Sequence, residues 1–221
     1  MIENSNICQK IDHTLLTSSA TSLDIDILCQ EAKKYNFYSV CINPSWLNNV
    51  KTILNTSSVK LCTVIGFPLG SSSTSSKLHE VDFAFNNGAD EIDVVMNIGF
   101  FKDKNYKYIN NEITQVVKNS KNKIVKVIIE AGVLNSFEIK IASKIVEDNG
   151  ADFVKTSTGF SKFGASTKII KIIKSVLNSG TKIKASGGIK SLNQLDQLIK
   201  LGVDRFGTSS SVIIMNEINN K

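Results

Sequence analysis

Short apolar runs alternate with longer amphipathic segments along the whole chain. The runs are rich in β-branched residues, which is typical of buried parallel strands. They predict strands at residues 10–15, 39–42, 61–67, 91–97, 124–131, 153–157, 183–186 and 205–207. Apolar residues at helical spacing predict helices near residues 22–35, 44–54, 74–87, 103–119, 136–149, 167–178 and 191–201, and a last helix from residue 210.

A weak repeat marks three junctions between a helix and the strand that follows it. Its copies are Asn87-Gly88-Ala89-Asp90, Asn149-Gly150-Ala151-Asp152 and Leu201-Gly202-Val203-Asp204. A glycine just after the last helical turn can adopt the left-handed conformation, which ends the helix. Each copy is therefore expected to close a helix and to open a strand.

Repeated strand–helix units with apolar strands predict a parallel sheet covered by helices. Eight such units are the number that closes a barrel. We therefore expect residues 1–221 to form a single α/β domain, a (β/α)8 (TIM) barrel, with an open, doubly wound sheet as the alternative. In a barrel, functional side chains lie at the C-terminal ends of the strands and in the loops that follow them.

Composition narrows the classes of function. The net charge is +6, but Arg205 is the only arginine, and the lysines are spread over the helical segments. Because arginine is the residue that binds bases and phosphates in bidentate fashion, we expect no nucleic-acid partner. No apolar run approaches the roughly 18 residues of a membrane span, and no signal peptide is visible, so we expect a cytoplasmic protein. The four cysteines form no CxxC pair and no zinc spacing, so we expect free thiols.

Two lysines stand at the ends of predicted strands, each before a turn of small residues. Lys155 lies in the sequence FVKTSTG, and Lys184 lies in IKASGGI. Burying an ammonium group without a partner is unfavourable, so such a lysine tends to lose its proton. A neutral lysine attacks carbonyl carbons, and a second cation nearby favours the neutral form. The two lysines are a candidate Schiff-base site, unless both are ordinary solvated lysines.

Other polar residues interrupt the remaining strands. Asp93 in EIDVVMN is a candidate proton shuttle held ionised by the lysines, or else part of a structural ion pair. Asp12 has a comparable place in the first strand, and Lys126 in the fifth adds a cation that we expect to contact the substrate. Cys41 has no histidine placed to activate it, so we expect it to line the substrate site. Together these groups would form a coupled network inside the barrel.

Small residues after the last strands predict a phosphate site. In barrels, phosphate often binds in the loops after strands seven and eight and at a short helix N-terminus. Free backbone N–H groups bind the anion there, and glycine allows its close approach. Either stretch alone could be a plain turn. The candidate binding residues are Thr158, Gly159, Gly187, Gly188, Ser209 and Ser210.

Motifs of several other enzyme classes are missing. The only histidines, His13 and His79, have no ligand-like spacing, so no metal site is predicted. The sequence contains neither GxGxxG nor GxxxxGK[ST], so no nucleotide cofactor is predicted either.

Taken together, the motifs resemble those of the deoxyribose-phosphate aldolases, class I aldolases on a (β/α)8 barrel. The resemblance runs from Asp12 to Ser210. It is carried, in order, by IDHTLL (11–16), FPLG (67–70), GADEIDVV (88–95), GADFVKTSTG (150–159), KASGG (184–188) and RFGTSS (205–210). It implies reversible cleavage of 2-deoxy-D-ribose 5-phosphate to D-glyceraldehyde 3-phosphate and acetaldehyde, with no metal or organic cofactor.

The resemblance also implies a role for each matching residue. Lys155 corresponds to the Schiff-base lysine, and Lys184 to the second lysine that favours its neutral form. Asp93 corresponds to the acid/base residue, which works through a water, and Asp12 to a supporting member of the proton relay. Gly187, Gly188, Ser209 and Ser210 correspond to the phosphate site. A homo-oligomer, most simply a dimer, is expected on the same grounds.

The chain departs from the family pattern in two places. Lys162 and Phe163 replace small residues after KTSTG, so Lys162 is expected either to contact the phosphate or to be solvated. The tail at residues 219–221 lacks the tyrosine that reaches the site in some members. Alternative functions are another Schiff-base aldolase or a transaldolase, a silent barrel that only binds a phosphorylated ligand, and a basic nucleic-acid module.

Overall fold

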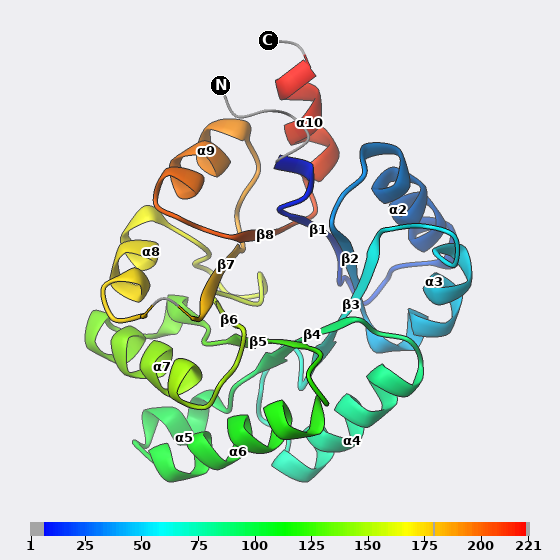
Figure 1. The fold of residues 1–221 in the computed structure, drawn as a ribbon. Coiled ribbons are helices and arrows are strands. Elements are labelled where there is room, and N and C mark those ends of the chain that lie inside the picture. The colour runs from blue at the N-terminus through cyan, green and yellow to red at the C-terminus, as the bar shows by residue number, and fades with distance from the viewer. Residues whose placement is uncertain (1–6, 179, 220–221) are drawn as a thin grey trace.

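Eight parallel strands close into a barrel in the order of the sequence, with β8 pairing back onto β1. The computed structural model describes residues 7–178 and 180–219, and Figure 1 shows its ring of strands surrounded by helices. The predicted (β/α)8 barrel is confirmed, and the open sheet is excluded. The strands are β1 (Ile11–Leu15), β2 (Ser39–Ile42), β3 (Lys60–Ile65), β4 (Glu91–Val95), β5 (Ile124–Ile128), β6 (Phe153–Lys155), β7 (Lys182–Ser186) and β8 (Arg205–Thr208).

The helices pack on the outside of the ring (Figure 1). They are α2 (Ser22–Tyr35), α3 (Leu47–Ile53), α4 (Thr74–Asn86), α5 (Ile98–Lys102), α6 (Tyr106–Asn119), α7 (Ser136–Asp148), α8 (Thr167–Lys174), α9 (Leu192–Lys200) and α10 (Ser211–Asn219), with 3-10 turns η1 (Pro44–Trp46) and η2 (Ala131–Val133). The short helix α5 was not predicted. Across the described residues, no helix combines the length and apolar character that crossing a bilayer requires.

Several strands end before the residue that the apolar pattern predicts. Gly66 turns the chain out of β3 with a φ of +61°, and Glu130 follows β5 with a φ of +49°. After β4, Asn97 caps α5 by accepting the N–H of Phe100 at 3.1 Å. After β4 and β5 the first loop residues are still buried, and after β3 Gly66 and Phe67 are half-buried, so the apolar pattern continues past the strand ends.

The Gly-X-Asp repeat connects neighbouring strands of the barrel. Its glycines have positive φ values of +98°, +76° and +87°, so they end the helices as expected. Its aspartates do more, because each carboxylate accepts a backbone N–H at the start of the preceding strand. The three pairs are Asp90 with Leu61 (2.8 Å), Asp152 with Val125 (2.8 Å) and Asp204 with Ile183 (2.9 Å). The repeat thus helps to hold the strands in register.

The two faces of the barrel wall differ in chemistry. Outward-facing strand residues such as Val40, Ile92 and Val127 pack with the helices into one large apolar cluster. The interior instead buries charged side chains, which is unfavourable unless they are paired. These are Asp12, Glu91, Asp93, Lys126, Lys155, Lys184 and Arg205. The concentration of buried charge marks the barrel interior as the place to look for function.

Candidate active site

Three lysines converge on the carboxylate of Asp93 in the barrel interior. Lys155 Nζ lies 2.7 Å and Lys184 Nζ 2.6 Å from Oδ2, while Lys126 Nζ lies 2.9 Å from Oδ1. The four residues come from β4, β5, β6 and β7, where alternate side chains point inward. The structure therefore brings together the two lysines and the aspartate that the sequence singles out.

A second layer of ions holds this cluster from the N-terminal side of the strands. Asp12 bridges Lys184 (2.5 Å) and Arg205 (2.8 Å), and Glu91 bridges Lys126 (2.6 Å) and Arg205 (3.3 Å). The guanidinium of Arg205 also stacks 3.4 Å above the ring of Tyr38. The sequence analysis missed Arg205 and Glu91. Glu91 lies two residues before Asp93 on β4, and Arg205 two residues before Gly207 on β8, so both point into the barrel. The alternation of strand residues could have revealed them.

The network keeps its charged forms despite burial. Burial raises the pKa of Asp93, but Lys126, Lys155 and Lys184 outweigh this effect and hold it well below its usual range. Burial lowers the pKa of Lys184, yet Asp12 and Asp93 raise it above its ordinary value. The pKa of Lys126 is raised in the same way by Asp93 and Glu91. At neutral pH, Asp93 is therefore a carboxylate and both of these lysines are ammonium ions.

Among the described basic groups of the barrel interior, Lys155 has the fewest carboxylate partners. Among the described residues of the interior, Lys126, Lys184 and Arg205 each contact two carboxylates. Lys155 contacts only Asp93, which it shares with two other lysines. Three carboxylates face four basic groups, so the set holds one basic group in excess. Lys155, with a single shared carboxylate, is the least paired of the four.

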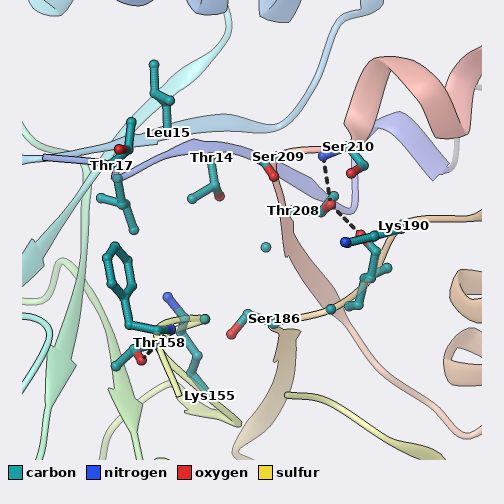
Figure 2. Close-up of a pocket in the computed structure, with 17 residues that line it drawn as sticks. Thr14, Leu15, Thr17, Lys155, Thr158, Ser186, Lys190, Thr208, Ser209 and Ser210 are labelled. Carbon is teal, nitrogen blue, oxygen red and sulfur yellow. Dashed lines mark hydrogen bonds between the residues drawn. The ribbon is translucent and has the colours of Figure 1, made fainter. Parts of the chain in front are cut away.

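A cavity of about 450 Å³ opens beside Lys155 at the C-terminal end of the barrel. Figure 2 shows Lys155 and Thr158 on one side of it, with Thr208, Ser209 and Ser210 across from them. Six of the eight predicted binding residues line this cavity: Thr158, Gly159, Gly187, Gly188, Ser209 and Ser210. Asp12, Asp93 and Lys184 are not among its lining residues. Asp93 contacts the lining residue Lys155, Lys184 contacts Asp93, and Asp12 contacts Lys184.

The far side of the cavity has the features of an anion site. Gly187 and Gly188 have positive φ values of +86° and +76°, conformations that favour glycine. Within the described part of the chain, their N–H groups and that of Ser209 donate to no protein acceptor. Helix α10 begins at Ser211, and the side chain of Lys190 lines the same end. Lys190 was missed, although it lies only two residues after Gly188.

Cys41 and Lys126 are not among the residues that line the cavity. Lys126 is fully buried behind Asp93, and Cys41 packs with Leu16, Cys62 and Val64 in a small apolar cluster. The thiol of Cys62 donates to Asp93 Oδ1 at 3.4 Å. Both thiols and this carboxylate lie within 4.8 Å of one another, but the surrounding ammonium groups oppose a metal cation there. The structure thus places both residues behind the reacting end of the site.

The family of the chain follows from comparisons with known proteins. A model of the DeoC/LacD family aldolases matches residues 7–209. The chain belongs to this aldolase family. It is 53% identical over 213 residues to a deoxyribose-phosphate aldolase of Mycoplasmoides pirum, covering 95% of this chain and 96% of the relative. It is 49% identical over 210 residues to one of Dictyoglomus turgidum, covering 95% and 96%. A solved tetrameric deoxyribose phosphate aldolase from Aeropyrum pernix matches with a TM-score of 0.93 and 32% identity, covering 99% and 93%.

The loop between β6 and α8 shows how this aldolase accommodates its departures from the family pattern. Lys162 and Phe163 line a neighbouring cavity of about 670 Å³ and not the one beside Lys155. Lys162 is therefore not placed to contact a phosphate at Gly187. Gly164 keeps the close packing, since a Cβ at that position would lie 2.1 Å from the carbonyl oxygen of Gly187. In the tail, residues 220 and 221 lie outside the described residues.

Proposed function

We propose that this chain is a class I aldolase that reversibly cleaves 2-deoxy-D-ribose 5-phosphate to D-glyceraldehyde 3-phosphate and acetaldehyde. The relatives that match it over nearly their whole length are deoxyribose-phosphate aldolases. The observation that carries the proposal is Lys155, an incompletely paired amine at the wall of a cavity that ends in an anion site. An amine in that position is suited to attack the aldehyde of a sugar phosphate.

The first step is formation of an imine. The neutral amine of Lys155 attacks the C1 carbonyl of the open-chain sugar, and loss of water from the carbinolamine gives a protonated imine. Lys184, which Asp12 and Asp93 keep as an ammonium ion, favours the neutral form of its neighbour. Asp93 stays ionised and stabilises the positive imine nitrogen. Lys126 supports Asp93 from behind, and Cys41 forms part of the apolar packing there.

The imine then accepts the electrons of the C2–C3 bond. Asp93, through a water, takes the proton of the C3 hydroxyl as this bond breaks, so glyceraldehyde 3-phosphate leaves and an enamine remains. Protonation of the enamine at C2 restores the imine, and hydrolysis releases acetaldehyde and the free lysine. Asp12 supports the proton transfers through its contact with Lys184.

The phosphate gives the substrate its orientation. Its oxygens accept hydrogen bonds from the N–H groups of Gly187 and Gly188, after β7, and of Ser209, just before α10. Ser210 and Lys190 line the same end of the cavity. Thr158 and Gly159 line the wall between phosphate and lysine. Binding energy from this distant group would hold C1 next to Lys155.

Trapping with borohydride tests the proposal. The protein is incubated with 2-deoxyribose 5-phosphate, reduced and digested, and the modified peptide is found by mass. We expect an adduct on Lys155 that is lost in Lys155→Ala. An adduct on Lys184 would reverse the two lysine assignments. No adduct in folded protein would leave a silent phosphate-binding barrel, and faster cleavage of fructose or sedoheptulose phosphates would indicate another aldolase or a transaldolase.

Assembly, domain structure and location complete the proposal. We propose that residues 1–221 form one domain and that the enzyme is a cytoplasmic homo-oligomer, most simply a dimer. The relative from Aeropyrum pernix is tetrameric, which supports oligomerisation in general. Light scattering after size-exclusion chromatography would give the number of subunits.

A further inference from the structure

Glu130 occupies an unusual place at the C-terminal end of the barrel. It follows β5 and is 8% exposed, and its backbone adopts a left-handed conformation with φ +49° and ψ +56°. Residues other than glycine rarely adopt this region, and such conformations persist where surrounding contacts hold them. The side chain of Glu130 makes contacts that can supply this constraint.

The carboxylate of Glu130 accepts hydrogen bonds from the loop after β6. Thr158 donates to Oε2 from its hydroxyl at 2.5 Å and from its backbone N–H at 3.3 Å. Ser161 donates its hydroxyl to Oε1 at 2.9 Å. No lysine, arginine or histidine of the described chain forms a salt bridge with this carboxylate. A buried carboxylate is thus held by neutral donors that all come from one loop.

That loop forms one wall of the substrate cavity. Thr158, Gly159 and Phe160 line the cavity, and Phe160 donates its N–H to the Thr158 hydroxyl at 3.1 Å. The ring of Phe160 also packs edge to face against Phe67, with centroids 5.3 Å apart. Figure 2 shows Thr158 beside Lys155 at this wall. A shift of the loop would therefore move the wall that lies next to the reacting lysine.

We propose that Glu130 is a positioning residue that holds the loop at residues 158–161 in place as the wall of the substrate cavity. The inference rests on the proposed aldolase function but concerns a residue that touches neither Lys155 nor Asp93. Both oxygens of Glu130 accept, which a glutamine side chain with one oxygen cannot reproduce. Its left-handed backbone aims the carboxylate at the loop.

Two substitutions separate the side-chain contacts from the backbone conformation. Glu130→Gln keeps the shape but replaces one acceptor oxygen by a donor. Glu130→Gly removes all the contacts and relieves the left-handed backbone. Lys121→Gly is the matched control, because Lys121 is exposed and has a φ of +51°. It tests relief of the backbone alone, far from the cavity lining.

The first readout is steady-state kinetics with 2-deoxyribose 5-phosphate. We expect KM to rise about tenfold in Glu130→Gly and less in Glu130→Gln, because a misplaced wall weakens substrate positioning. Borohydride trapping of acetaldehyde on Lys155 should persist in both, since the contacts of Asp93 do not involve Glu130. Lys121→Gly should match the parent chain in both measurements.

The second readout, amide hydrogen exchange of residues 158–163, does not depend on activity. Faster exchange of these amides in both Glu130 variants, with the rest of the barrel unchanged, is the expected result. Unchanged KM and unchanged exchange in Glu130→Gln would overturn the proposal, and this variant decides if Glu130→Gly does not fold. Absence of trapping in the parent chain would instead refute the aldolase function, while the exchange result would still judge Glu130.

Discussion

Buried ion pairs lie outside and inside the barrel in the described part of the chain, and the pKa values of the two groups shift in opposite directions. Outside the barrel, Lys77 of α4 and Glu112 of α6 form a fully buried pair at 2.9 Å. Burial lowers the pKa of Lys77, and Glu112 offsets this only in part. Burial likewise raises the pKa of Glu112 against the effect of Lys77. Inside the barrel, the pKa of Asp93 instead falls and that of Lys184 rises.

The number of partners explains the difference. Lys77 and Glu112 each have one oppositely charged partner among the described residues, whereas Lys184 has two carboxylates and Asp93 has three lysines. Removing a charge from water has a penalty that a single pairing often fails to offset. Several pairings around one group can offset it. Burial alone therefore does not tell whether an ionic side chain stays charged.

The two sites also differ in what their contacts hold. Lys77 donates to the carbonyl of Val95 at 2.7 Å, and Glu112 accepts the N–H of Asn97 at 3.0 Å. The two contacts secure the last residue of β4 and the chain just after it, close to Asp93 in sequence. The pair outside the barrel thus fixes backbone, while the network inside leaves one amine at a cavity.

The largest effect is expected from removing that amine. Lys155→Met should lower kcat by about 10³-fold or more, because no other lysine of the barrel interior lines the cavity. The unfolding temperature should stay the same or rise, since the change removes the basic group in excess over the carboxylates. Coupled detection of glyceraldehyde 3-phosphate and thermal unfolding measure the two outcomes.

Lys162→Met is the matched control for this substitution. Lys162 lies in the loop that follows β6, the strand that carries Lys155, but it lines the neighbouring cavity. Its replacement should change kcat/KM by no more than about twofold, as for a side chain without substrate contact. Equal losses in the two variants would contradict the special position of Lys155.

A smaller effect, on stability, is expected from neutralising the shared carboxylate. Asp93→Asn leaves three lysines facing a neutral amide, and breaking a buried ionic cluster in this way costs about 3–5 kcal/mol. Glu112→Gln should cost less, because burial already disfavours the charged form of its partner. Urea unfolding at pH 7 compares the two. The comparison fails if Glu112→Gln proves the more damaging.

The fold was accessible from sequence because strands buried on both faces leave continuous apolar runs. The Gly-Ala-Asp stretches added the places where helices end, since only a few residues tolerate a φ such as the +98° of Gly88. Strand ends were less accessible. Beyond Ile128, for example, the chain leaves β5 but Ile129 is still buried, so hydrophobicity does not report the change of backbone direction.

The site was accessible only in part, for a geometric reason. Charged residues that interrupt apolar strands, such as Asp93 and Lys184, point into the barrel, and this alternation can be read from sequence. The position of a side chain along the barrel axis cannot be read from it. Lys126 is in register with Phe153, two residues before Lys155 on β6, so it lies behind the cavity. Predicting that Lys126 contacts substrate required the very information that alternation lacks.

A further prediction removes one oppositely charged pair in each of the two places. Lys77→Met combined with Glu112→Gln should change the unfolding free energy by no more than about 1 kcal/mol, because removing a whole buried pair is often neutral. The glutamine can still accept the N–H of Asn97. Lys184→Met combined with Asp12→Asn should be clearly more damaging, since Asp93 and Arg205 each lose a partner. Equal effects of the two double variants would show that partner number does not matter.

The smallest and most specific effect concerns pH. The pKa of Glu112 is raised on folding, so the folded state binds its proton more tightly, and stability falls as pH rises through that value. The advantage of the parent chain over Glu112→Gln should therefore shrink from about pH 4.3 upward, starting at the ordinary glutamate pKa. The pKa of Asp93 is lowered on folding, so its contribution is complete above about pH 3.9 and is lost only in stronger acid. Urea unfolding between pH 4 and 7 should thus give a sloping difference for Glu112→Gln and a level one for Asp93→Asn. A level difference for both would mean that one partner is enough to keep a buried carboxylate charged.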